Sequence, residues 1–76
     1  MNNFPANVAV ELERARNKYP RINSLHEGYA VFLEELDEFK HEVWKKQPER
    51  SDPQMYWELV QLAAMCQRVA EDVLLR

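Results

Sequence analysis

The sequence predicts an all-α protein, a three-helix antiparallel chain that completes a helical bundle by homo-oligomerisation. Apolar residues recur at intervals of three and four along three segments, which is the spacing of a helix face. The single glycine is Gly28, and no stretch shows the alternation or the turn residues of a β-hairpin. Prolines and polar residues separate the three segments. We therefore expect one all-helical domain over residues 1–76.

The first helix is expected over residues 4–19. Asn3 is a candidate N-cap, and Pro5 follows at a first-turn position where a helix tolerates proline. Pro20 ends the helix, because the residue before a proline is disfavoured in the helical region. The apolar face of this helix consists of Phe4, Val8, Leu12, Ala15 and Tyr19.

The second helix is expected over residues 24–46. Ser24 and Glu27 have the spacing of a capping box, which satisfies free N–H groups at a helix start. Gly28 lies inside this helix, where we expect it to permit close approach of another helix. The polar segment 47–52 is the connector that follows. The apolar face consists of Leu25, Tyr29, Phe32, Leu36, Phe39 and Val43.

The third helix is expected over residues 53–75, with Asp52 as its cap and Pro53 as its first residue. Trp57, Val60 and Ala64 lie well away from its main apolar face, so we expect burial on more than one side. Three helices do not suffice to cover both sides, so we infer a homodimer or a dimer of dimers. The main apolar face consists of Met55, Leu59, Leu62, Cys66, Val69 and Val73.

Composition excludes several classes of protein. The formal net charge is -3 and the basic residues are scattered, so we expect no nucleic-acid partner. No apolar run approaches the length of a membrane span, and the first residues lack the pattern of a signal peptide. Cys66 is the only cysteine, which predicts a buried thiol without a disulfide and a cytoplasmic location.

Two polar stripes are candidates for chemistry. Glu35, Glu38 and Glu42 share one face of the second helix. If the second and third helices pack antiparallel, this stripe approaches a second one, and converging carboxylates favour a bound Mg²⁺ or Mn²⁺. The alternative is a solvated acidic face, with Arg68 and Asp72 as a surface ion pair. The second stripe consists of Glu58, Gln61, Met65, Arg68 and Asp72.

The segment 33–39 reads Leu-Glu-Glu-Leu-Asp-Glu-Phe and resembles the E-E-x-x-E signature of the MazG-like, all-α nucleoside triphosphate pyrophosphohydrolases. The second half of the family motif is E-x-x-D on the next helix. Here Trp57-Glu58-Leu59-Val60-Gln61 occupies that place, and its first residue follows Glu38 by 19 residues. The amino-acid sequence of segment 24–31 is also similar to that of short members of the family. The resemblance covers roughly residues 22–75.

This resemblance implies a Mg²⁺-dependent cleavage of NTP or dNTP to the monophosphate and pyrophosphate, with a nucleoside triphosphate as the partner. It assigns Glu35, Glu38 and Glu58 as metal ligands, with Gln61 as a further candidate. Glu34 corresponds to a ligand or to a base that orients the attacking water. The implied catalytic set is therefore Glu34, Glu35 and Glu38.

Two departures from the family pattern bear on activity. Gln61 stands where the family has aspartate, and an amide is a weaker metal ligand than a carboxylate. The family usually has a fourth helix with basic residues that hold phosphates, and here Lys45, Lys46, Arg50 or Arg68 could take their place. We assign Lys45, Arg68 and Asp72 to substrate binding. The alternative functions are nucleotide or metal binding without hydrolysis, and a helical interaction module.

Overall fold

The computed structural model describes residues 3–76 and contains three α-helices in that range, with no strand. Helix α1 comprises Phe4–Lys18, α2 comprises Leu25–Val43 and α3 comprises Asp52–Val69. A 3₁₀ turn, η1, covers Gln47–Glu49 in the connector, and a π-helical turn, η2, covers Ala70–Leu74 at the end of α3. The predicted all-α class and the number of helices are confirmed.

Side chains cap all three helices at their N-termini. The Asn3 side chain accepts a hydrogen bond from the Ala6 N–H at 3.1 Å, as predicted. The Ser24 hydroxyl accepts from the Glu27 N–H at 3.1 Å, so the predicted cap is confirmed. The prediction that Asp52 caps α3 is wrong. Ser51 is the cap, since its hydroxyl accepts from the N–H of Gln54.

The ends of α2 and α3 differ from the predicted ends. Helix α2 stops at Val43, three residues before the expected end at residue 46. The Lys45 N–H then donates to the Glu42 carbonyl at 3.3 Å, so the chain tightens into the connector. Beyond Val69 the helix widens, and the Leu75 N–H donates to the Ala70 carbonyl at 2.9 Å, the five-residue spacing of a π-helix.

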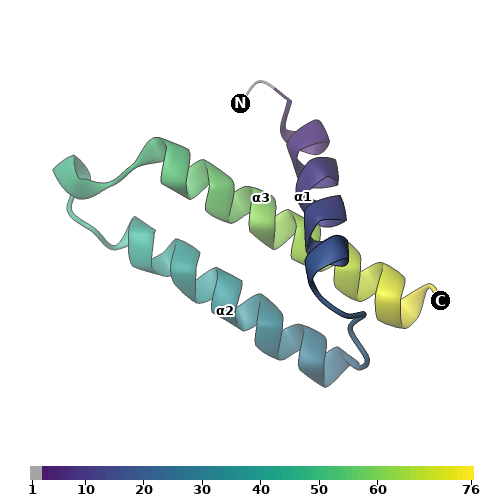
Figure 1. The fold of residues 1–76 in the computed structure, drawn as a ribbon. Coiled ribbons are helices and arrows are strands. Elements are labelled where there is room, and N and C mark those ends of the chain that lie inside the picture. The colour runs from purple at the N-terminus through teal and green to yellow at the C-terminus, as the bar shows by residue number, and fades with distance from the viewer. Residues whose placement is uncertain (1–2) are drawn as a thin grey trace.

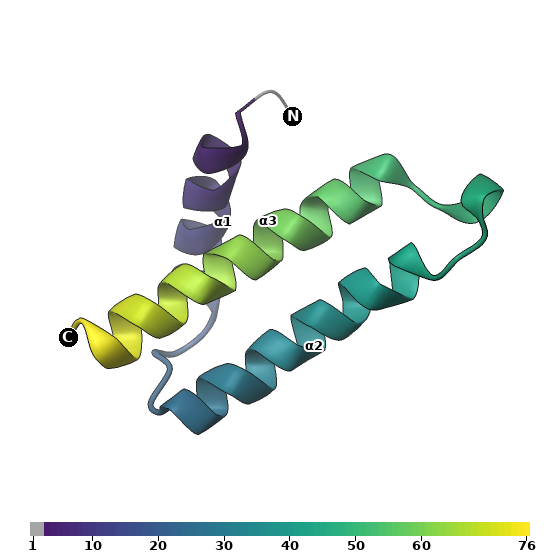
Figure 2. The same cartoon turned by 180° about the vertical axis from the view of Figure 1, so that it is seen from behind.

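Helix α3 is the centre of the molecule. It lies antiparallel beside α2, and α1 crosses it on another side in both views (Figure 1 and Figure 2). The molecule measures 43 × 27 × 18 Å, so it is elongated and thin. No helix within residues 3–76 has the length and apolar content needed to cross a membrane.

The core follows from this central position of α3. Val60 is fully buried and Ala64 is 2% exposed, because α1 and α2 pack against different sides of α3. The inference that Val60 and Ala64 need a partner chain is therefore wrong, while Trp57, the third residue of that prediction, is 45% exposed. The predicted main apolar face of α3 is also wrong in part, since Cys66 and Leu59 are exposed. The buried apolar side chains are Ala15, Ile22, Val60, Leu62, Ala64 and Met65.

At Gly28, helix α2 lies close against Val69 of α3. A Cβ atom at this position would lie 2.8 Å from Cγ2 of Val69, which is too close for two carbon atoms. Gly28 therefore lets the two helices pack closely at the end of α3, as predicted.

Candidate metal centre

Helices α2 and α3 bring Glu35, Glu38 and Glu58 together. One carboxylate oxygen from each of the three residues lies within 4.8 Å of the other two. Glu35 and Glu38 are one helical turn apart on α2, and Glu58 comes from the first half of α3. The predicted approach of the two stripes is confirmed. We call these three residues the carboxylate cluster.

The cluster lies at the boundary of the core. Glu58 is 6% exposed, Glu35 is partly buried and Glu38 is exposed, so burial increases from Glu38 to Glu58. The amide nitrogen of Gln54 donates to Oε1 of Glu58 at 2.6 Å. The ion pairs within residues 3–76 involve other carboxylates, so no basic side chain compensates the cluster directly.

Burial and mutual repulsion raise the pKa values of two members of the cluster. Burial is the largest cause that raises the pKa of Glu35 to about 7, and the carboxylates of Glu38 and Glu58 add to it. Burial also raises the pKa of Glu58, with a smaller contribution from Glu38, although the hydrogen bond from Gln54 opposes the change. The folded chain thus holds negative charge where it is costly, and a cation would relieve this cost.

Gln61 lies beside the two buried members of the cluster. With its amide nitrogen turned toward them, it donates to Oε2 of Glu58 at 3.2 Å and to Oε2 of Glu35 at 3.3 Å. This orientation is the one that satisfies both partners. Gln61 therefore contacts the candidate metal ligands, and its N–H groups hold two carboxylates near each other.

The donor set suits a hard divalent cation. Three carboxylates offer oxygen ligands without nitrogen or sulfur, which is the preference of Mg²⁺ and Mn²⁺. Gln61, predicted as a further ligand, presents its N–H groups and not its amide oxygen to Glu35 and Glu58, so the cluster itself offers three ligand oxygens. The side chains present thus fit such an ion.

Two cavities open on either side of the cluster, and Glu38 lines both. The connector cavity, of about 610 Å³, lies between α2, the connector and the start of α3, and Glu58 lines it. The central cavity, of about 570 Å³, lies between α1, α2 and α3, and Glu35 and Gln61 line it. A ligand on the cluster can therefore extend in two directions.

Glu34 has a different position from the other predicted catalytic residues. Its side chain is exposed and lines the central cavity, outside the carboxylate cluster. Glu35 and Glu38 are in the cluster itself. Glu34 is thus placed at the rim of the site, where it can meet a ligand in the central cavity.

Glu42 and Lys45 form a compensated pair at the end of α2. Nζ of Lys45 lies 2.9 Å from Oε2 of Glu42, and Oε1 of Glu42 accepts from the Ser51 N–H at 2.8 Å. The hydrogen bond from Lys45 is the largest cause that lowers the pKa of Glu42. Glu42 thus ties the connector to α2, and the charge of Lys45, a predicted substrate-binding residue, is already partnered.

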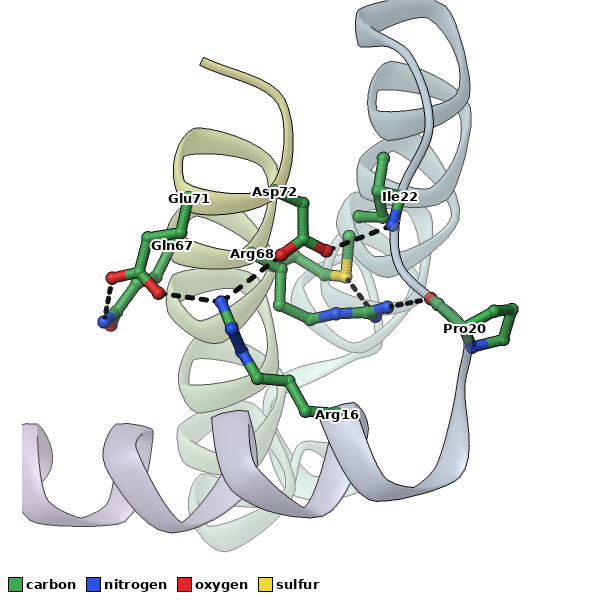
Figure 3. Close-up of polar contacts among 8 residues, drawn as sticks. Arg16, Pro20, Ile22, Gln67, Arg68, Glu71 and Asp72 are labelled. Atoms are coloured by element: carbon green, nitrogen blue, oxygen red, sulfur yellow. Dashed lines mark hydrogen bonds and ion pairs between the residues drawn. The ribbon is translucent and has the colours of Figure 1, made fainter. Parts of the chain in front are cut away.

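Arg68 and Asp72 are not a surface pair, because each is 5% exposed and contacts other groups (Figure 3). Oδ2 of Asp72 accepts from the Ile22 N–H at 3.0 Å, and Oδ1 lies 3.5 Å from Nη2 of Arg16. Nη2 of Arg68 donates to the Pro20 carbonyl at 3.1 Å. The surface-pair interpretation is therefore wrong. We call these contacts the loop anchor, since they hold the α1–α2 loop on α3.

The three predicted substrate-binding residues, Lys45, Arg68 and Asp72, therefore lie at different places in the structure. Asp72 follows Glu58 by fourteen residues, which is about 21 Å along a helix. Its carboxylate belongs to the loop anchor. Arg68 lies closer, seven residues after Gln61 on the same face, and lines the central cavity. The three residues thus do not form one group around the cluster.

Sequence reasoning missed three residues near the cluster. Gln54 hydrogen-bonds Glu58, and its spacing of four residues from Glu58 on one helix was a usable signal. Arg14 and Lys18 bring positive charge from α1 into the central cavity. Nothing in the spacing along α1 predicts that contribution, because it depends on how α1 crosses α3.

Comparison of the chain with protein-family models, with curated proteins and with solved structures gave no match.

Proposed function

We propose that this protein is a Mg²⁺-dependent nucleoside triphosphate pyrophosphohydrolase that converts NTP or dNTP to the monophosphate and pyrophosphate. The observation that carries this proposal is the carboxylate cluster, whose three oxygens lie within 4.8 Å of one another without a compensating basic side chain in the described chain. The resemblance of segment 33–39 to the E-E-x-x-E signature supplies the reaction. A cytoplasmic location belongs to the proposal and rests on the single cysteine.

The chain's own residues have separate tasks in this reaction. Glu35, Glu38 and Glu58 would hold Mg²⁺, which when bound neutralises the triphosphate and makes a water easier to ionise. Glu34, at the rim, would orient the attacking water or serve as a further ligand. The water oxygen bonds to the α-phosphorus, and the bond from that phosphorus to the β-bridging oxygen breaks, so pyrophosphate leaves. Gln61 keeps Glu35 and Glu58 in position.

Pyrophosphate release across a panel of NTPs and dNTPs, with Mg²⁺ or Mn²⁺, tests the proposal. We expect Glu38→Gln to lower the rate by about 100-fold, a loss typical of a disturbed metal site. Glu13→Gln is the matched control, because Glu13 is an exposed carboxylate on α1 outside both cavities. Release by wild type no greater than by Glu38→Gln would exclude hydrolysis.

The Gln61 amide favours a second candidate, a protein that binds metal or nucleotide without efficient hydrolysis. An amide adds no negative charge beside Glu35 and Glu58, so metal affinity is expected to be modest. We expect Gln61→Asp to tighten Mg²⁺ binding by about tenfold. Titration with Mg²⁺ followed by NMR measures this, and signals of Glu35, Glu38 and Glu58 that do not move would leave only a helical interaction module.

We also propose that a second copy of the chain covers the outer face of α2 and α3. Tyr29 is 68% exposed and Leu36 is 40% exposed on α2, while Leu59 is 41% exposed on α3. Helix geometry places Tyr29 and Leu36 on the side of α2 away from Glu34, so the dimer would leave the cluster open. Sedimentation tests this, since Leu36→Glu should produce monomers, and a wild-type monomer at micromolar concentration would contradict it.

A further inference from the structure

We propose that the central cavity binds the diphosphate end of the triphosphate, with Lys18 and Arg68 as its cationic contacts. The monophosphate and its nucleoside would then lie toward the connector cavity. This inference rests on the proposed function, and it adds the direction in which the substrate lies across the carboxylate cluster. It also makes α1 a part of the site.

The two cavities differ in their positive charge. Three basic side chains line the central cavity, two from α1 and one from α3, namely Arg14, Lys18 and Arg68. The connector cavity has one lysine, Lys45, whose charge is partnered by Glu42 at 2.9 Å. Since the diphosphate end carries most of the charge of a triphosphate, the central cavity is the better match for it.

The cations of the central cavity differ in availability. Arg14 is already bound by Glu11 at 2.6 Å. Lys18 has no carboxylate partner within residues 3–76, and its Nζ lies 5.3 Å from the centre of the Tyr19 ring. A lysine with this freedom can turn toward a phosphate without breaking an ion pair.

Arg68 adds a buried charge to the same cavity. It is 5% exposed, and its guanidinium carbon lies 5.8 Å from the centre of the Tyr19 ring. Its terminal nitrogens donate to the Pro20 carbonyl and the Met65 sulfur, neither of which carries a negative charge. Its Nε has no hydrogen-bond partner among the described residues. A buried guanidinium without an anionic partner is stabilised by a nearby phosphate.

The charge balance of the cavity makes this binding depend on the metal. Five carboxylates line the central cavity beside the three basic side chains, so the cavity alone is net negative. A free diphosphate is therefore repelled. A divalent cation on the cluster offsets part of this charge at one end, while Lys18 and Arg68 attract the anion from the other.

Calorimetric titration with inorganic pyrophosphate tests the inference. With Mg²⁺ present, we expect Lys18→Gln to weaken binding by about tenfold, while Lys18→Arg restores most of it. Lys40→Gln is the matched control, since Lys40 is an exposed lysine on α2 that lines neither cavity, and we expect a change under about twofold. Without Mg²⁺, pyrophosphate should not bind. NMR shifts on pyrophosphate addition should appear at Lys18, Tyr19 and Arg68.

Equal weakening by Lys18→Gln and Lys40→Gln, or shifts at His41 and Lys45 instead, would overturn the inference. The test of pyrophosphate binding can fail or succeed independently of the test of NTP hydrolysis. If the protein binds pyrophosphate through Lys18 but hydrolyses no NTP, the binding site in the central cavity is supported and the proposed hydrolase activity is excluded. If the protein hydrolyses NTP but Lys18→Gln leaves the affinity for pyrophosphate unchanged, the hydrolase activity is supported and the binding site in the central cavity is excluded.

Discussion

Helix α3 and the π-helical turn η2 that continues it each carry a buried carboxylate, and the surroundings of the two differ. Glu58 is 6% exposed and Asp72 is 5% exposed, so both lose a similar share of their hydration. Asp72 receives the Ile22 N–H at 3.0 Å and has Arg16 at 3.5 Å. Glu58 has two amide side chains beside it, from Gln54 and Gln61, and two other carboxylates within 4.8 Å.

The difference separates a structural acid from a candidate ligand. A buried charge is tolerated when hydrogen-bond donors and a cation compensate it, as Ile22 and Arg16 do at Asp72. At Glu58 the hydrogen-bond donors are neutral amides, and the neighbouring side chains are carboxylates of the same charge. The negative charge of Glu58 is therefore uncompensated and can bind a metal cation. Similar burial therefore serves stability at Asp72 in η2 and favours metal binding at Glu58 in α3.

The largest effect is expected at Asp72. Asp72→Ala should lower the free energy of unfolding by about 3 kcal/mol, because it leaves a buried N–H of Ile22 and the charge of Arg16 without a partner. Urea denaturation measures this loss. Glu71→Ala is the control, since it removes an exposed pair with Arg16 and should cost under about 1 kcal/mol. Similar losses in the two variants would mean that the loop anchor contributes little.

Glu58→Gln should stabilise the folded chain, in contrast to Asp72→Ala. With chelator present, we expect it to raise the free energy of unfolding by about 1 kcal/mol, because it removes a charge from a buried group with like-charged neighbours. The same variant should lose the stabilisation that Mg²⁺ gives to wild type. Glu42→Gln provides the contrast and should destabilise, as Lys45 and Ser51 lose a charged partner. A destabilised Glu58→Gln would contradict the comparison.

The smallest effect concerns pH. The pKa of Glu35 rises on folding from 4.5 to about 7, so between these values the folded chain holds a proton that the unfolded chain has released. Metal-free stability should therefore fall as pH increases from 4.5 to about 7 and then level off. Glu58 acts in the same direction, and Glu42 in the opposite one.

Bound Mg²⁺ favours the ionised carboxylates and should reverse this dependence. The increase in melting temperature on adding Mg²⁺ is therefore expected to be larger at pH 8 than at pH 6. Circular dichroism measures both curves. Glu35→Gln should flatten the metal-free curve between pH 5 and pH 7. The effect is modest because Glu35 is partly exposed and solvent screens its charge.

Local signals in the chain predicted much of the site. The spacing of Glu35 and Glu38 and the short connector were enough to bring Glu58 near them, because two antiparallel helices joined by a short turn have little freedom in register. The same periodicity failed for Cys66, which is exposed. An apolar stripe defines a face but not which neighbour covers it.

The amino-acid sequence by itself determined the three helices, their caps at Asn3 and Ser24, and the acidic stripe of α2, because each depends on residues within a turn or two of one another. Only the tertiary structure decided which acids are compensated. Arg16 and Ile22 reach Asp72 across about fifty residues, and α1 brings Lys18 to the central cavity. The free energy of a buried charge depends on such distant partners, and spacing along one helix does not encode them.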